Sequence, residues 1–364
     1  MLQSLDGAFY RRLAITAAAL AVYRLGVQLP VPGLVPETLA VTFKPGDLAI
    51  KSVSIFALGI MPLLTVLILA EFVKIFAPAV RRWEHAGPRN RDIVRHTVIG
   101  LALLIAAVQG AGLAGALEGV SGLVLEPGIY FRVICTMTFV AGAALVIALA
   151  GVIDRAGLGS GLWLIFLAQP LAELPPNLAA IAAAYDAGQY SLLAVVRSAM
   201  FTALAVAAVA SLVLAARGAA AVSAACVWPL LIAYSVLAWL LIGIGLLVSG
   251  GSIETAMAIT APGSAIRQLA LTAVVILIAW LYVRSTRLAG LPSPIPAAPI
   301  AAVLAAIALA AEMLQSQLQT ALPLGSVHLV IATVVATTIL IDWGFIGGNE
   351  RPVEDASEPL SPQA

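Results

Sequence analysis

The residues of this chain that could carry out chemistry are few. The sequence holds three histidines, His85, His96 and His328, and two cysteines, Cys135 and Cys226. Both cysteines stand inside apolar runs without the spacing of metal ligands, so we interpret them as small buried hydrophobes. An enzyme needs a convergent nucleophile, base or metal set, and neither an HExxH motif nor a pair of acids stands within the apolar runs. The sequence therefore predicts neither an enzyme nor a bound cofactor.

Two short apolar motifs around prolines have a more distinctive spacing. One is Gly59-Ile60-Met61-Pro62-Leu63-Leu64 and the other is Cys226-Val227-Trp228-Pro229-Leu230-Leu231. In each motif a β-branched residue precedes a leucine by four positions, which places both side chains on one face of a helix. The similarity of the motifs marks either two related halves or a coincidence in a low-complexity apolar sequence.

Composition indicates where such helices must lie. Of the 364 residues, 62% are hydrophobic and only 10% are charged. A soluble domain of this length cannot bury that much apolar surface, whereas a bilayer can accommodate it. The formal net charge of +1 gives no indication of a nucleic-acid partner.

The apolar residues gather in runs long enough to span a membrane, for which about 20 residues are needed. These runs have no period-2 alternation, which favours helices over a barrel. The sequence predicts an all-α polytopic membrane protein with spans near residues 13–31, 55–77, 97–117, 130–152, 159–174, 192–216, 224–248, 265–283, 293–314 and 326–343. A cleaved signal peptide over 13–23 is the alternative for the first span, but nine apolar segments would follow it.

Basic residues predict the orientation. Thirteen lysines and arginines fall on the side that holds both termini, five fall on the other side, and Arg24 lies in the first span. The positive-inside rule therefore predicts that both termini face the cytoplasm. The tail at 344–364, rich in acids and prolines, is predicted to be disordered.

Ten spans divide into two sets of five, which must insert in opposite directions, as in inverted-repeat transporters. We predict an N-terminal half at 1–176 and a C-terminal half at 177–343. A secondary transporter shares this plan but needs polar or charged residues at the midplane. The candidate midplane residues here are aliphatic, which disfavours a transporter.

Several stretches resemble SecY, the channel-forming subunit of the protein translocase. The strongest is Ser54-Ile55-Phe56-Ala57-Leu58-Gly59-Ile60-Met61-Pro62, which is similar to the SecY second helix almost letter for letter. Tyr23-Arg24-Leu25-Gly26, Pro30-Val31-Pro32-Gly33 and Gly157-Leu158-Gly159-Ser160-Gly161 also match. The similarity runs from residue 11 to about 177 and continues more weakly to 343.

The resemblance implies a clamshell of two inverted five-helix halves. Such a channel would pass unfolded polypeptides across the membrane, or release helices into it through a lateral gate between spans 2 and 7. The implied pore ring is Ile60, Leu64, Leu162, Phe166, Val227, Leu231 and Val330, with Phe166 bulkier than the family's aliphatic residue. The implied gate includes Pro62, Thr65, Pro229 and Tyr234. The implied plug lies in 34–53 and includes Thr38, Leu39, Val41, Phe43 and Leu48; a plain solvated loop is the alternative.

The resemblance also implies partners, namely SecE-like and SecG-like small subunits and the translocating polypeptide. In SecY proteins, long cytoplasmic loops reach SecA or the ribosome. Here the corresponding loops, 216–224 and 284–292, are short enough only to turn the chain between neighbouring helices. We therefore expect weak docking of SecA and ribosomes, and a specialised relative with few substrates remains the alternative.

One charged residue within a span stands apart. Glu71 occupies a position where the family commonly has an amide. An ionisable group inside a span is costly and suggests a function. The alternative is that Glu71 lies near the cytoplasmic end and is accommodated there beside Lys74, three residues away.

Overall fold

The structure is a computed structural model. It describes residues 7–35, 53–216, 220–248, 263–291, 295–316 and 322–343, with Thr38 and Ala261 as single residues. Its helices are α1 Gly7–Gly26, α4 Met61–Phe76, α5 Pro78–His85, α6 Pro88–Glu118, α7 Ile129–Ala156, α8 Gly161–Asp186, α9 Leu192–Ala215, α10 Ala220–Val248, α12 Ala265–Leu288, α13 Ala297–Ser316 and α14 Ser326–Asp342. The predicted all-helical fold is confirmed. Every helix except α5 corresponds in order to one predicted span.

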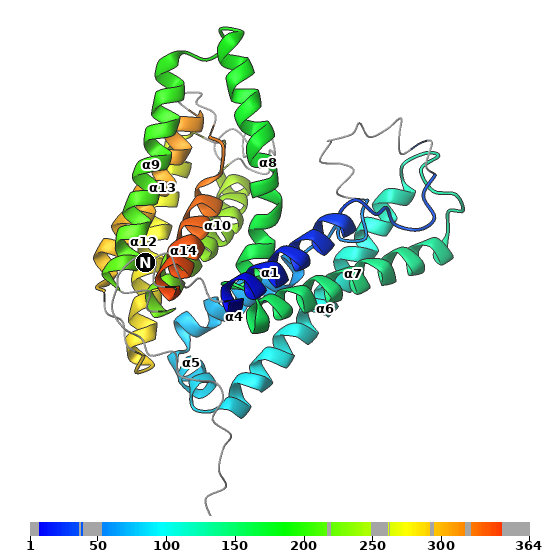
Figure 1. Cartoon of the computed structure of the whole chain (residues 1–364), viewed down its shortest axis with the longest axis horizontal. Helices are drawn as coiled ribbons and strands as arrows, with labels where there is room; N and C mark the ends of the chain where they lie inside the picture. The colour runs from blue at the N-terminus through cyan, green and yellow to red at the C-terminus, as the bar shows by residue number, and fades with distance from the viewer. Residues whose placement is uncertain are drawn as a thin grey trace, which may run out of the picture.

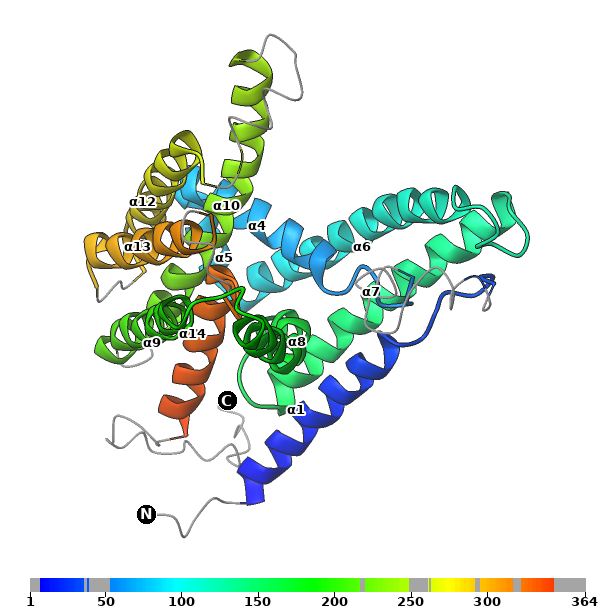
Figure 2. The same cartoon turned by 90° about the horizontal axis from the view of Figure 1, so that it is seen from above.

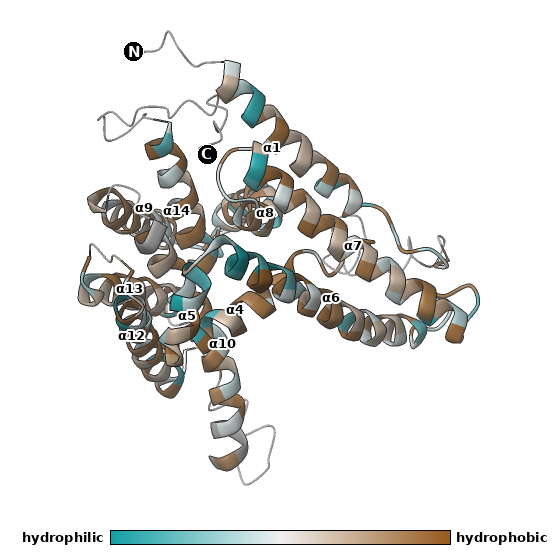
Figure 3. Ribbon diagram, turned by 90° about the horizontal axis from the view of Figure 1, so that it is seen from below, coloured by the Kyte–Doolittle hydropathy of each residue, from teal (hydrophilic) through white to brown (hydrophobic). Residues whose placement is uncertain are grey.

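Most of these helices are long and apolar enough to cross a bilayer. Seven described helices meet that test on their own, from α6 to α10 together with α12 and α13. The bent pair of α4 and α5 would make an eighth, and α14 is apolar but shorter. Apolar residues run along most of the helices in Figure 3. The set is compatible with the predicted ten spans.

The helices form two groups (Figures 1 and 2). In the first, α7 packs along both α1 and α6, and α4 contacts α6. In the second, α12 packs between α10 and α13, while α14 contacts α9 and α10. Helix α8 contacts α7 of the first group and α14 of the second. The groups are also joined directly, because α4 contacts α10 and α12.

The start of the second span differs from the prediction. Residues 53–60 form turns, and the helix begins at Met61 rather than near residue 55. Gly59 has a φ of 51°, a left-handed conformation that interrupts a helix. Pro62 lies in the first turn of α4, where its missing N–H has no helical partner to lose. Pro62 therefore starts a helix, whereas Pro229 lies inside α10.

The fifth span also differs. We predicted an end near residue 174, before Pro175 and Pro176, but α8 continues to Asp186 with three prolines inside it. The residues that follow the prolines, 177–186, are mostly alanine and other helix-forming residues, and these extend the helix. The predicted boundary at residue 176 thus falls inside a helix. The far ends of α8 and α9 project together at the top of Figure 1.

Candidate functional site

The predicted ring residues lie in two clusters of buried apolar side chains near the junction of the helix groups, where α10 contacts both α4 and α14 and α14 contacts α8. Leu64, Val227, Leu231 and Val330 belong to one cluster of buried apolar side chains. Ile60 belongs to a neighbouring cluster, against which Leu162 packs. Phe166 packs against both clusters and so links them. The seven predicted residues therefore fall in two apolar clusters that share Phe166, and their closure into one ring stays a prediction.

The α4 side of this region is held by a close backbone approach. The N–H of Leu64 donates to the carbonyl of Ile60 at 3.0 Å, so the pair spans the first turn of α4. The preceding segment lies against α7 so closely that a Cβ on Gly142 would sit 2.0 Å from the Ile55 carbonyl oxygen. Only glycine fits at that contact. Gly142 thus fixes the segment that positions Ile60.

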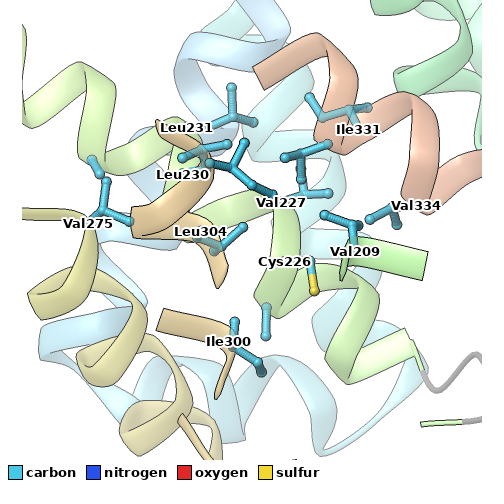
Figure 4. Close-up of a cluster of buried hydrophobic side chains, with 14 of the residues drawn as sticks. Val209, Cys226, Val227, Leu230, Leu231, Val275, Ile300, Leu304, Ile331 and Val334 are labelled. Carbon is cyan, nitrogen blue, oxygen red and sulfur yellow. The ribbon is translucent and has the colours of Figure 1, made fainter. Parts of the chain in front are cut away.

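The α10 side lies deep in the second group. Val227 and Leu231 are 2% and 8% exposed, and the two side chains flank Pro229. Figure 4 shows both residues among apolar side chains of neighbouring helices, including Val209, Leu304 and Ile331. The adjacent Cys226 is fully buried, as predicted, and so is Cys135. Their predicted role as buried apolar residues is confirmed.

Sequence reasoning missed an aromatic cluster beside the ring. The Phe166 ring stacks on His328 with centroids 5.1 Å apart, and Trp163 packs edge-on against Phe166 at 6.4 Å. Trp163 also packs against Trp228 on α10, at 5.2 Å. Three helices that are distant in sequence supply these rings, so no spacing within one helix indicated the cluster. Trp228, inside the proline motif, was the one available signal.

The predicted gate residues are less closely associated. Thr65 donates its hydroxyl to the carbonyl of Met61 in its own helix, at 2.9 Å. The Tyr234 hydroxyl is 3.0 Å from the Ser326 hydroxyl, so it is engaged with α14. Of the predicted plug residues, only Thr38 is described, and it is half-buried. Leu39, Val41, Phe43 and Leu48 lie outside the described residues, as does the tail at 344–364.

A second site, which is polar and was largely unpredicted, lies at the end of α4. The chain turns by 111° between α4 and α5. The turn brings Glu71 within 2.9 Å of Lys74 and 3.0 Å of Arg81, while Lys74 is 2.7 Å from Glu84. The Glu71 side chain is only 12% exposed, so its charge is compensated by pairing rather than by water. We call these four residues the charge cluster. Within the described residues, no group of three histidine, cysteine or acidic side chains could hold a metal.

Together these features define a class of protein: a multi-pass helical membrane protein whose two helix groups meet at clusters of buried apolar side chains. A sequence model of the SecY family matches residues 54–290. The chain belongs to the SecY family.

Curated relatives agree with this assignment. The protein translocase subunit SecY of Thermus thermophilus is 32% identical over 226 residues, covering 57% of this chain and 51% of the relative. The SecY subunit of Escherichia coli K12 is 31% identical over 189 residues, covering 48% of this chain and 42% of the relative. The chain spans about half the length of the curated relatives it matches.

Solved structures share the fold over nearly the whole chain. Sec61 in the canine ribosome–channel complex from the endoplasmic reticulum has a TM-score of 0.60 at 14% identity, covering 93% of this chain and 94% of that one. A structure described as a protein conducting channel has a TM-score of 0.59 at 12% identity, with the same coverage. The arrangement of the helices is therefore that of SecY and Sec61.

Proposed function

We propose that this chain is the channel-forming subunit of a membrane translocase and that unfolded polypeptides pass through its apolar ring. The observation that carries the proposal is that these seven apolar residues, on or next to α4, α8, α10 and α14, lie in two apolar clusters that share Phe166, in a member of the SecY family. None of the seven carries a charge that would retain a passing chain. When the ring is closed, its dewetted surface excludes ions and water.

A lateral exit between α4 and α10 is part of the proposal. In the closed arrangement α4 contacts α10 and α12, across the junction of the two groups. Separation of these helices would open the apolar region toward lipid, and an apolar segment of a substrate would partition there. Pro62, Thr65, Pro229 and Tyr234 lie on the two helices that would part.

A site-specific photocrosslink tests passage through the ring. A photoreactive amino acid would replace Leu231 in one variant and Trp239 of the same helix in a control. Leu231 is buried at the ring, whereas Trp239 is 77% exposed. We expect an arrested secretory polypeptide to crosslink at 231 and not at 239. Equal crosslinking at both positions, or none at 231 while the polypeptide is bound, would contradict the proposal.

We expect SecE-like and SecG-like subunits to accompany the chain, and SecA and ribosomes to dock weakly. Helix α9 ends at Ala215 and α10 begins at Ala220, while α12 ends at Leu288 and α13 begins at Ala297. Connections this short cannot form a protruding hairpin, and a stable interface needs about 800 Å² per partner. Binding of SecA and ribosomes to the purified complex, beside a SecY with long loops, measures this. If SecA and ribosomes bind this complex as tightly as the SecY with long loops, the expectation of weak docking is wrong and the proposed channel is unaffected.

We expect the chain to lie in a bacterial plasma membrane, with both termini and the basic segment at 78–96, which holds α5 and the start of α6, facing the cytoplasm. A reporter that is active only outside the cytoplasm, fused after Trp343, should be inactive. An active reporter would reverse the proposed orientation and leave the helix arrangement unchanged.

A further inference from the structure

The charge cluster at the end of α4 also contacts the second helix group. The Arg81 guanidinium lies over the Tyr282 ring at 4.6 Å, and its Nη1 is 3.4 Å from the Tyr282 hydroxyl. The Ser285 hydroxyl donates to the main-chain carbonyl of Lys74 at 2.6 Å. Tyr282 and Ser285 lie on α12 and are 3% and 1% exposed. Residues more than 200 positions apart are thus joined at one buried place.

Two kinds of contact occur here: ion pairs within the first helix group, and uncharged contacts that join this group to α12. Each ion pair of the charge cluster lies within α4 and α5: Glu71 with Lys74 and Arg81, and Lys74 with Glu84. The contacts to α12 involve hydroxyl groups and an aromatic ring, with no charged residue of α12 taking part. Helices α4, α5 and α12 lie together in Figures 1 and 2.

This division matters when the two groups separate. Pulling α12 away would break the contacts of Tyr282 and Ser285, and the exposed hydrogen bond from Arg82 of α5 to the Leu288 carbonyl at 3.0 Å, but leave every ion pair of the cluster intact. The two cations therefore keep their carboxylate partners, and no buried charge is left alone. Exposed hydroxyls can exchange protein partners for water at small net cost. A junction of this composition can hold the two helix groups in one defined closed position and still allow them to separate.

We propose that Tyr282 and Ser285 form a releasable latch on the charge cluster, which positions α12 against α4 when the lateral gate is closed. The ion pairs hold Arg81 and the end of α4 in the geometry that the latch needs. The latch rests on the proposed gate between the two groups. It lies at the end of α4 predicted to be cytoplasmic, so it would govern that end of the gate rather than the ring.

The test removes the latch hydroxyls and measures the gate directly. Tyr282→Phe and Ser285→Ala each remove one hydroxyl while the ring over Arg81 stays. Thr286→Val is the matched control, because Thr286 is also buried on α12, at 6% exposed, but its hydroxyl donates to the Tyr282 carbonyl of its own helix, at 2.9 Å. Dyes on Arg89→Cys and Arg287→Cys, both exposed in the parent, report the separation of the groups by energy transfer in lipid nanodiscs. The native cysteines are buried and shielded from labelling.

We expect each hydroxyl removal to shift the closed-to-open ratio about fivefold toward the open state, which is the usual net effect of losing one buried hydrogen bond. The double variant should shift this ratio further than either single variant. Thr286→Val should match the parent. The latch would be overturned if the dye separation equals that of the parent in all three variants, namely Tyr282→Phe, Ser285→Ala and the double variant. It would also be overturned if Thr286→Val shifts the dye separation as much as these variants do. If Ser285→Ala fails to fold, Tyr282→Phe decides the matter alone.

The dyes report separation whether or not the protein conducts. Opening of the groups in a protein that passes no polypeptide would support the latch and contradict the proposed channel. Photocrosslinking of a polypeptide at Leu231, with no change in dye separation in the variants, would support the channel and contradict the latch.

Discussion

The two helix groups meet in two chemically opposite places. At the ring, the contact consists of apolar side chains from Ile60 to Val330, and no charged side chain takes part. At the end of α4, two buried cations and two buried hydroxyls meet two partly buried carboxylates. Apolar contact is non-directional, which suits the proposed closure of the ring around polypeptides of many shapes. Hydrogen bonds and ion pairs are directional, so the second place specifies one closed geometry.

The largest effect is expected from removing a shared cation of the charge cluster. Lys74→Met leaves Glu84 without its partner and Glu71 with only Arg81. Breaking a buried ion pair in this way should cost about 3–5 kcal/mol of stability. Thermal unfolding in detergent micelles, followed by tryptophan fluorescence, measures the loss.

The matched control for that change is Arg95→Met. Arg95 and Asp92 are 3.7 Å apart and more than 60% exposed, so their pair should contribute at most about 1 kcal/mol. Similar losses in both variants would show that the charge cluster is no more than a set of surface charges.

A smaller effect is expected at the glycine that supports the ring. A Cβ on Gly142 would meet the Ile55 carbonyl at 2.0 Å, so Gly142→Ala must displace backbone and should cost about 1–3 kcal/mol. Gly112→Ala in α6 meets no atom within 4 Å and should be neutral or stabilising by up to about 1 kcal/mol. Unfolding of the two variants side by side measures the difference. Equal stability would contradict the role of Gly142 in positioning Ile60.

The smallest effect is expected from Phe166→Leu. The change removes the stacking on His328 and should cost about 1 kcal/mol. Leucine remains apolar, so ion leakage through the closed channel should be unchanged. Increased leakage in liposomes would show that the aromatic ring itself, rather than apolar character, seals the constriction.

Sequence alone predicted much of the fold. Ten apolar runs gave ten helices in order, because a run of apolar residues needs no tertiary information to be recognised. The ring residues came from the resemblance to SecY, and the i, i+4 spacing of Ile60 with Leu64 and of Val227 with Leu231 only adds that each pair shares one helix face. Both pairs are buried, as a ring requires, but their assembly into one ring stays a prediction.

The parts that were missed depend on geometry between segments. Gly59 and Pro62 shortened the second span, and the alanine-rich residues after Pro176 lengthened the fifth. Lys74 was predicted beside Glu71 from its spacing, and the 2.9 Å contact agrees. The contacts of Arg81 and Tyr282 were not predicted. Arg81 reaches Glu71 only because the chain turns by 111° between α4 and α5, and Tyr282 reaches Arg81 only because α12 packs there.

The central claim, that the apolar ring seals the closed channel, is tested most directly by ion leakage. Ile60→Ser with Leu231→Ser places two hydroxyls in the ring. Leu69→Ser with Ile242→Ser changes two exposed residues on the same helices, 56% and 55% exposed, as the control. In proteoliposomes we expect the ring pair to conduct small ions several-fold faster than the parent and the control pair to match the parent. Conduction by the ring pair no faster than the parent would contradict the account.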